Sequence, residues 1–595
     1  MDTRFFTPGS ITPVPSRGRD GASNASVAPE AGPSGSLHDP PLEPRDEAVF
    51  LLTAAAEIEH ALMVQYLYAA YSVRVVAGPH EQQLREIRDL LTQIAREEMG
   101  HLATVQNLLH LVGGQVHLDR NRSAGATDVS PFRFALEPLS LDSLAKYVIA
   151  ESPMPLPDTV SAGDAELVER IREDAVKANG GQEVRHVGRI FERLDHLFAT
   201  GLADADIRPD TGGRHATFDD WGFEPRSAAA GEKLIVESFP ETDPGPLRDA
   251  ARKAVSKIGE QGEGSDLGPV GTESHFERFL EIYKRVSTLV DAGAQVAHPV
   301  ATNPNTSPPG AGQELDPGRI THRRARAWAR LFNLRYRMLL QQLAHFLLLD
   351  QPVYSSAPGP RLGDRTARGL LLVGAFDEMR YLGKIAGKLV NLPKEEPATG
   401  THAGPPFELP YTLNLPDGEE QRWRRHLDVS LASVRLVREE LPPIDAEPFL
   451  EHMVESDLRA QAVMSSLARG EGIPPENLPT GFAKVVTILE EAVRGFTIGR
   501  HGNLWAGTTR DGFLALRFFG TPPVMEDQGG VVADPDAAPL IARLSDPVPR
   551  TRMPRLRPPV PAERVSFIRQ WISDGCPDNS PPGSVGVQHE PDPTP

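Results

Sequence analysis

The segment Glu98-Met-Gly-His101 carries a carboxylate and an imidazole at a spacing that suits metal binding. Residues three positions apart on an α-helix lie on one face, so these two side chains can bind a single metal ion. In helical bundles that hold two metal ions, such a pair is joined by a lone Glu from a neighbouring helix. Glu59 is the candidate for that acid, and the three residues together indicate half of a dimetal centre.

Both acids fall within apolar stripes that predict amphipathic helices. The stripes consist of Leu52, Ala55, Leu62, Met63, Tyr66, Leu67 and Ala70 around Glu59, and of Leu91, Ile94, Leu102, Val105, Leu108 and Leu109 around Glu98. The second helix is expected to end at Gly113-Gly114, a typical C-cap pair. Because burying an uncompensated carboxylate costs several kcal/mol, these acids should be paired, protonated or metal-bound.

Two alternatives stay open for this half of the site. Glu-x-x-His also occurs on solvated helix faces without binding a metal. The neighbouring acids Glu57 and Glu97 are alternatives to Glu59 and Glu98 as ligands. Tyr66, on the same stripe as Glu59, is predicted first as a core residue and second as a substrate-stacking or radical residue, which makes it a catalytic candidate beside Glu98.

A second Glu-x-x-His, formed by Glu183 and His186, is the candidate for the other half of the centre. It lies at the start of a helix predicted over residues 181–198 from the stripe that includes Ile190 and Leu194. The alternative for Glu183 is a charge that complements the dipole at the helix N-terminus.

His275 is a further candidate ligand, on an apolar helical face with Phe276 and Phe279. A lone His on such a face is more often a core residue. The acids just upstream, Glu260 and Glu263, favour a site here instead.

Length and composition indicate a large globular chain. The sequence has 595 residues, of which 39% are hydrophobic, and a formal net charge of -19. This length is sufficient for several domains. The negative charge and the lack of a basic patch exclude a nucleic-acid-binding protein and favour small-molecule or protein partners.

Cysteine usage and the N-terminus bear on metal chemistry and location. Cys576 is the single cysteine, so neither an intramolecular disulfide nor a Cys-x-x-Cys metal or haem motif can form, and oxygen and nitrogen ligands remain. No basic N-terminal region followed by an apolar run is found, nor any uncharged apolar stretch of about 18 residues. We therefore expect a cytoplasmic protein without a membrane partner.

Prolines and low-complexity stretches divide the chain. Helices are broken near Ser152-Pro-Met-Pro-Leu-Pro157 and near residues 240–246. The expected organisation is a disordered segment 1–44, a metal-binding bundle 45–297, a flexible linker 298–317, a second helical block 318–495 packed on the bundle, a small module 496–582 and a flexible tail 583–595.

The second block and the module differ in pattern. Helices in the block are predicted over residues 319–349, 365–392, 419–441 and 447–469. The module is expected to be strand-like or irregular, from Trp505, Phe513, Leu514, Leu516, Phe518 and Phe519, before a last helix over 562–574. The predicted fold class is all-α, a helical bundle extended by further helices and a small irregular module.

Several of these motifs together resemble the ferritin-like iminophenyl-pyruvate dimer synthase family. The motifs are Glu59-His60, Tyr66-Leu-Tyr68, Glu97-Glu98-Met-Gly-His101, His186-Val-Gly188, Gln261-Gly-Glu263-Gly264, Ser274-His275-Phe276, Leu331-Phe-Asn333 and Ala403-Gly-Pro405. The resemblance spans about residues 45–470. This family includes the ferritin-like parts of bisindole biosynthesis enzymes, such as those on the violacein and rebeccamycin routes.

The resemblance implies a ferritin-like core and oxidative coupling of imines derived from aromatic 2-oxo acids. Carried over by position, the implied ligands are Glu59, Glu98, His101, Glu260 or Glu263, and His275, with His186 or Glu183 in addition. Glu273 stands only two residues before His275, which departs from the Glu-x-x-His of ferritins. A mononuclear or degenerate site therefore stays open.

The C-terminal segment around Trp571 and Cys576 resembles the closing part of some c-type cytochrome-like modules. The haem-attaching Cys-x-x-Cys-His is absent, so covalent c-type haem is excluded. Trp571 is predicted to be a core residue of this small module.

Together these features predict a non-haem iron oxidoreductase of natural-product biosynthesis, with one or two iron ions and manganese as the alternative metal. Its substrate is expected to be a small amino-acid-derived molecule such as an aromatic 2-imino or 2-oxo acid, with O₂ as a second reactant. A homo-oligomer and a pathway-enzyme partner both stay open. The alternatives are an iron enzyme of another class, carrying out oxygenation or carbon–nitrogen chemistry, and a non-catalytic interaction protein.

Overall fold

A computed structural model gives the fold of the chain. It describes residues 41–120, 130–217, 235–263, 274–307, 316–351, 366–441, 447–473, 481–492 and shorter segments up to 577, except for residues 159 and 411. The predicted disordered segment 1–44 lies almost wholly outside this range. Within the described residues all regular elements are helices, and β-pairing is limited to isolated bridges. The all-α fold class is thus confirmed.

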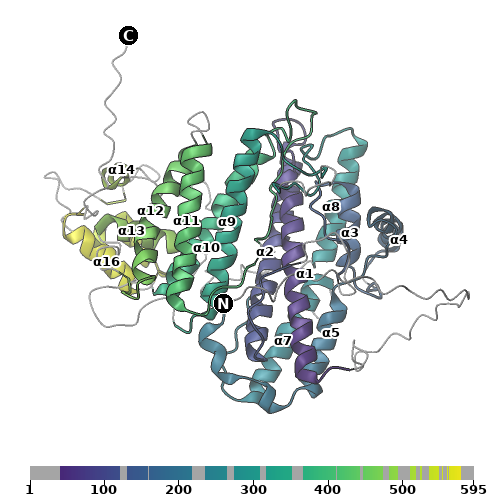
Figure 1. The fold of residues 1–595 in the computed structure, drawn as a ribbon, viewed down its shortest axis with the longest axis horizontal. Coiled ribbons are helices and arrows are strands. Elements are labelled where there is room, and N and C mark those ends of the chain that lie inside the picture. The colour runs from purple at the N-terminus through teal and green to yellow at the C-terminus, as the bar shows by residue number, and fades with distance from the viewer. Residues whose placement is uncertain are drawn as a thin grey trace, which may run out of the picture.

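Two long helices form one side of the first bundle. Helix α1 spans Pro44–Ser72 and α2 spans Glu81–Leu111, and the two pack along their whole length (Figure 1). Helix α2 is followed by Gly113, whose φ of 74° requires the left-handed region that glycine adopts without strain. Both helices agree with the predicted stripes.

The other side of the bundle is built from two interrupted helices. One consists of α3 (Leu141–Ala150) and α5 (Gly188–His196), and the other of α7 (Pro244–Glu263) and α8 (His275–Asp291). Figure 1 shows α3 above α5 and α8 above α7. Helix α3 packs on α8 and α5 on α7, so the four pieces act as the third and fourth rods of a four-helix bundle.

The first interruption follows from the prolines after Glu151. Pro153, Pro155 and Pro157 cannot continue α3, and the chain leaves the bundle to form α4 (Ala162–Ala178) on its outside (Figure 1). It then returns, and the Val187 backbone N–H donates to the Ala150 carbonyl at 3.2 Å. This bond joins the end of α3 to the start of α5.

The helix predicted over residues 181–198 begins later than expected. Residues 182–186 are not helical, and α5 starts at Gly188. The cause is the pair Gly180 and Gly181, whose φ angles of 70° and 83° take the chain out of the helical conformation after α4. After α5 come short turns of other helix types, Leu197–Gly201, Asp204–Asp206 and Pro209–Arg214.

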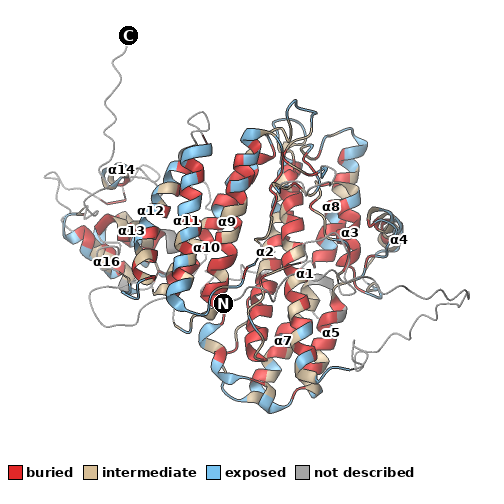
Figure 2. Cartoon of the chain, in the orientation of Figure 1, coloured by how far each residue is buried: buried red, intermediate tan, exposed pale blue. Residues whose placement is uncertain are grey.

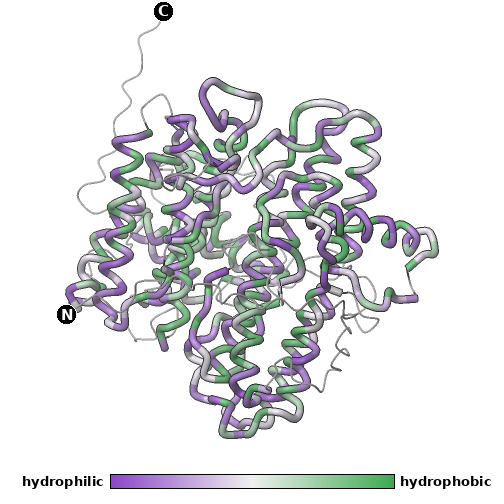
Figure 3. The backbone as a smooth tube through the Cα atoms, turned by 45° about the vertical axis from the view of Figure 1, so that its right-hand side comes forward, coloured by the Kyte–Doolittle hydropathy of each residue, from purple (hydrophilic) through white to green (hydrophobic). Residues whose placement is uncertain are grey.

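A continuous core fills the first bundle. Figure 2 shows buried residues along the helices of the bundle, and Figure 3 shows hydrophobic residues recurring among hydrophilic ones along these helices. Inside this core, Glu47 of α1 accepts from Arg193 of α5, with Arg193 Nε 3.0 Å from Oε1 and Nη2 2.7 Å from Oε2. The ion pair fixes α5 against α1.

The second helical block has the four helices that the sequence predicts. They are α9 (Arg323–Leu348), α10 (Ala367–Leu389), α11 (Glu419–Glu440) and α12 (Pro448–Leu467). Its hydrophobic cluster includes Val64 and Tyr68 of α1, so the block packs directly on the first bundle. The described part of the predicted linker is tied to the second block by two isolated β-bridges, Val300 with His402 and Asn305 with Arg319.

The C-terminal module is helical where it is described. It contains α13 (Gly481–Ala492), α14 (Arg510–Ala515), the short helix Pro535–Ala537, α15 (Pro539–Ser545) and α16 (Ala562–Ser573). The strand-like prediction for Phe513 and Leu514 is therefore wrong, because Thr509 caps a helix there through the Gly512 N–H. Phe518 and Phe519 lie outside the described residues. Trp571 and Cys576 are buried in the module's own cluster.

Among the helices in the described part of the chain, none is both long and apolar enough to cross a bilayer.

Candidate metal centre

Two groups of buried ligand atoms lie at the centre of the first bundle. Glu59, Glu98 and His101 each offer an atom within 4.8 Å of the others, and Glu98, Glu151 and His275 do the same. Glu98 belongs to both groups. The five residues come from α1, from α2, from the residue after α3 and from the first position of α8. Every rod of the bundle therefore contributes, and in the two interrupted rods the ligands belong to the α3 and α8 halves.

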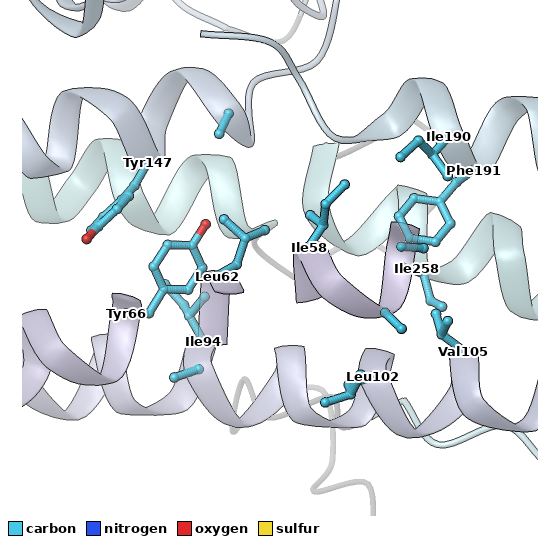
Figure 4. Packing of buried hydrophobic residues seen from close by; sticks show 14 of the residues in the cluster. Ile58, Leu62, Tyr66, Ile94, Leu102, Val105, Tyr147, Ile190, Phe191 and Ile258 are labelled. Carbon is cyan, nitrogen blue, oxygen red and sulfur yellow. The ribbon is translucent and has the colours of Figure 1, made fainter. Parts of the chain in front are cut away.

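The interruptions of the two broken rods lie at the same level as these groups. Glu151 stands where α3 ends and His275 where α8 begins. Apolar side chains lie on both sides along the helices, as Figure 4 shows: Leu62, Tyr66, Ile94 and Tyr147 in one group, and Leu102, Val105, Ile190, Phe191 and Ile258 in the other. The polar centre is thus enclosed between two hydrophobic layers.

His101 presents Nδ1 to the acids. This atom lies 3.0 Å from Glu98 Oε2 and 3.4 Å from Glu59 Oε2. On the other side of the ring, Nε2 lies 2.9 Å from Gln261 Oε1, near the end of α7. The Glu-x-x-His spacing thus places both of its side chains inward on α2, as predicted.

His275 is oriented in the same way. Its Nδ1 lies 3.0 Å from Glu98 Oε1 and 3.7 Å from Glu151 Oε2, and its Nε2 lies 2.9 Å from Glu97 Oε2. Arg278, one turn later on α8, contacts both oxygens of Glu97. Glu97 therefore lies behind the imidazole, on the side away from Glu98.

Tyr66 supports the third acid. Its hydroxyl donates to Glu151 Oε1 at 2.6 Å, and both side chains are buried. The ring packs edge-on against Tyr147 with centroids 4.8 Å apart. The sequence prediction that Tyr66 is a core residue is correct, and its hydroxyl in addition holds an acid of the centre.

Burial and neighbouring charges shift the pKa values of these groups. Burial first, and then the negative charge of Glu98, raise the pKa of Glu59 to about 8. Burial would lower the pKa of His101, but the neighbouring carboxylates of Glu59 and Glu98 raise it to about 10. Burial would raise the pKa of Glu97, but the charges and hydrogen bonds of Arg278 and His275 together hold it below its usual value. The centre thus strongly favours positive charge.

The donor atoms suit a metal ion. Glu59 Oε2, Glu98 Oε1 and His275 Nδ1 are buried, and their contacts with the described residues, such as the 3.0 Å between Glu98 Oε1 and His275 Nδ1, lack hydrogen-bond geometry. Such contacts are costly for polar atoms unless another ligand satisfies them. A cavity lies beside them, lined by the acids, by His101 and His275, and by apolar residues of α5 and α7. Carboxylate oxygens and imidazole nitrogens are ligands that iron and manganese accept.

Several candidate ligands lie elsewhere. Glu183 is exposed on the non-helical stretch before α5, and His186 on the same stretch is only partly buried, because this segment does not form the helix that would turn them inward. Glu260 accepts from Ser256 Oγ at 2.8 Å on the exposed side of α7. The structure brings none of the three into the two ligand groups. The side chain of Glu263 lies outside the described residues.

The open alternatives for the first half are also placed. Glu57 bonds to His117 at 3.0 Å and lies away from the centre. Glu97 contacts His275 from behind, so Glu59 and Glu98 are the acids in the ligand groups.

Glu151 was missed from the sequence, although a signal existed. Leu144, Val148 and Glu151 follow one helical face, and the proline break directly after Glu151 is visible in the sequence. For Gln261, the sequence offers only its place in the motif Gln261-Gly-Glu263-Gly264. Its contact with His101 depends on the packing of α7 against α2.

These features define a four-helix bundle, and residues 52–284 match the model of the ferritin-like family. The chain is similar to dichlorochromopyrrolate synthase of Lentzea aerocolonigenes, with 29% identity over 64% of this chain and 38% of that protein. It is also similar to 2-imino-3-(indol-3-yl)propanoate dimerase of Chromobacterium violaceum, with 27% identity over 66% of this chain and 36% of that protein.

These relatives confirm the resemblance inferred from the sequence. Both carry enzyme names, in agreement with the expectation of an enzyme. The chain spans less than two fifths of the length of either relative. Among solved structures, a ferritin-like protein from Caulobacter vibrioides matches at 16% identity over 58% of this chain and 94% of that chain, with a TM-score of 0.32.

Proposed function

We propose that this chain is a metal-dependent oxidoreductase that joins two aromatic 2-imino acids, using a dinuclear centre held by Glu59, Glu98, His101, Glu151 and His275. The observation that carries the proposal is the position of Glu98. Because its two oxygens face different ligand groups, Oε2 toward His101 and Oε1 toward His275, one carboxylate can serve both metal ions. This arrangement supports two ions rather than one.

Iron is the proposed metal, and manganese is the alternative for the same donors. When bound, a pair of iron ions supplies one-electron redox chemistry with dioxygen. Three acids and two imidazoles would hold the ions, and Tyr66 fixes the orientation of Glu151 by its 2.6 Å hydrogen bond. Leu62, Phe191 and Ile258 line the adjoining cavity and limit the access of water.

The proposed substrate follows from one relative. The name of the Chromobacterium violaceum protein states that it dimerises 2-imino-3-(indol-3-yl)propanoate, and we propose a substrate of this class here. Forming one carbon–carbon bond between two such molecules, with the loss of one hydrogen from each, releases two electrons and two protons. Dioxygen can accept the two electrons and the two protons to give hydrogen peroxide, so the reaction balances without another cofactor.

The test combines metal analysis with a product assay. The purified chain is reconstituted with Fe(II), desalted and analysed for bound iron, and then given the imine, generated from L-tryptophan by an amino-acid oxidase with added catalase. We expect two iron ions per chain and a product with the mass of two imines less two hydrogens. Glu57→Gln, a carboxylate change outside the centre, should retain both. Glu98→Gln should lose both.

Two results would overturn the proposal. Bound iron with an oxygenated monomer as product would indicate the alternative iron enzyme of another class. A chain that takes up neither iron nor manganese, and whose stability Glu98→Gln leaves unchanged, would indicate a non-catalytic bundle.

A further inference from the structure

We propose that Glu97, which lies outside both ligand groups, sets the ring tautomer of both histidines of the centre, acting on His275 directly and on His101 through Gln261. Both rings then carry their hydrogen on Nε2 and keep the Nδ1 lone pair for a metal. The inference rests on the proposed dinuclear centre, and it assigns Glu97 and Gln261 as positioning residues within it.

Hydrogen-bond donors surround the carboxylate of Glu97. Its Oε1 accepts from Arg278 Nη1 at 3.1 Å, and its Oε2 accepts from Arg278 Nη2. Gln261 Nε2 and His275 Nε2 each lie 2.9 Å from Oε2. Gln93 Nε2 lies 3.4 Å from Oε1. The guanidinium of Arg278 has only donors and contacts both carboxylate oxygens, so a hydrogen on either oxygen of Glu97 would face a donor. Glu97 is therefore held as an acceptor only.

The contact with Glu97 sets the tautomer of the His275 ring. Its Nε2 lies 2.9 Å from Glu97 Oε2. Because the carboxylate only accepts, Nε2 must carry a hydrogen. The lone pair of the metal-binding tautomer then lies on Nδ1, which faces Glu98 and Glu151. A carboxylate behind a ligand histidine is known to orient the ring and increase its basicity.

Gln261 imposes the same tautomer on His101. The Gln261 side-chain amide lies between Glu97 and His101, with 2.9 Å to each. The amide NH₂ must face the acceptor-only carboxylate, because the opposite orientation would place two oxygens against each other. The amide oxygen consequently faces His101 Nε2, which must donate to it. Nδ1 of His101 is then free to bind beside Glu59 and Glu98.

This arrangement gives different roles to two successive acids. Glu97 and Glu98 are about 100° apart around α2, so one reaches the rear of the imidazoles while the other reaches their front. Arg278 on α8 supplies the charge that holds Glu97, and Gln261 on α7 relays it. The two halves of the interrupted rod α7/α8 are thereby joined through a residue of α2.

The experiment uses metal affinity and histidine NMR. Zn(II) is titrated into the full chain carrying ¹⁵N-labelled histidine, with Glu97→Gln, Gln261→Leu and the control Glu57→Gln compared with the unaltered chain. We expect Glu97→Gln to weaken both metal positions by about 10–100-fold. Gln261→Leu should weaken only the position that contains His101. Glu57→Gln should weaken neither.

The NMR spectra test the tautomer itself. In the Zn(II)-loaded chain, the ¹⁵N shifts of His101 and His275 should show a hydrogen on Nε2 and metal on Nδ1, and in Gln261→Leu only His101 should change. Equal weakening of both positions by Gln261→Leu, or unchanged affinities in a folded Glu97→Gln, would overturn the inference. If Glu97→Gln does not fold, Gln261→Leu decides. None of these readouts requires turnover, so failure of the proposed coupling reaction is recognised separately.

Discussion

Glu98 Oε1 lies 3.0 Å from His275 Nδ1, although the two residues belong to helices at opposite ends of the ferritin-like segment. Glu98 Oε2 meanwhile lies 3.0 Å from His101 on its own helix. A single side chain thus connects a local pair, available from the sequence spacing, to a distant residue that only the folded bundle brings near.

Removal of the shared acid should affect metal content more than removal of an outer one. We expect Glu98→Ala to lose both ions, and Glu59→Ala to retain the ion beside Glu151 and His275, because Glu59 belongs to one ligand group only. Elemental analysis after reconstitution with Fe(II) or Mn(II) measures this, with Glu57→Ala as the control. Equal metal content in the Glu59 and Glu98 variants would show that the two groups do not act as separate positions.

The hydroxyl of Tyr66 should contribute to stability where that of Tyr147 does not. Tyr66→Phe removes a 2.6 Å hydrogen bond to the buried Glu151 and should lower the free energy of unfolding by about 1.5–3 kcal/mol. Tyr147 is also buried, but its hydroxyl has no hydrogen-bond partner among the described residues. Tyr147→Phe should therefore be neutral or stabilising. Urea unfolding of the two variants distinguishes them, and an equal loss in both would contradict the role given to the Tyr66 hydroxyl.

Gly259 should tolerate a methyl group but not a larger side chain. It lies in α7 beside the cavity, and an added Cβ would meet only the Phe191 Cβ, at the ordinary contact distance of 3.9 Å. Since glycine costs about 0.5–1 kcal/mol relative to alanine inside a helix, Gly259→Ala should stabilise the chain by that amount. Gly259→Leu should fill the cavity and reduce coupling of the imine, while Gly259→Ala retains bound metal. Thermal unfolding and the product assay measure both effects; destabilisation by alanine would show that the space is not available.

A buried acid in the second block should make stability depend on pH. Burial raises the pKa of Glu378 from 4.5 to about 8. The charge of Arg335 lowers this pKa in part, and the charge of Asp457 raises it further. Between these values the folded chain holds the Glu378 proton and the unfolded chain does not, so this residue's contribution to stability falls as pH rises from about 4.5 to about 8. The slope is at most about 1.4 kcal/mol per pH unit.

Glu378→Gln removes this titration and provides the comparison. The difference in unfolding free energy between Glu378→Gln and the unaltered chain should therefore increasingly favour the variant as pH rises across that window. Urea unfolding at several pH values measures it. A difference that is constant with pH would mean that Glu378 does not titrate in this range.

The sequence by itself determined the local half of the centre and most of the helices. Periodicity alone placed Glu59, Glu98 and His101 on the inward faces of α1 and α2, because helical spacing fixes which side chains share a face. The same periodicity predicted the four helices of the second block. It failed at residues 182–186, where two glycines override the helical pattern, and at α14, where a Thr cap stabilises a short helix within a β-prone segment.

Only the tertiary structure decided the second half of the centre. Glu151 and His275 stand at the ends of interrupted helices, and their approach to Glu98 depends on how α3 and α8 pack together. The choice between Glu97 and Glu98 likewise required the position of Arg278, which no spacing along the chain reveals. Local patterns fix the direction of a side chain on its own helix. The distance between side chains on different helices follows from the packing of the whole core.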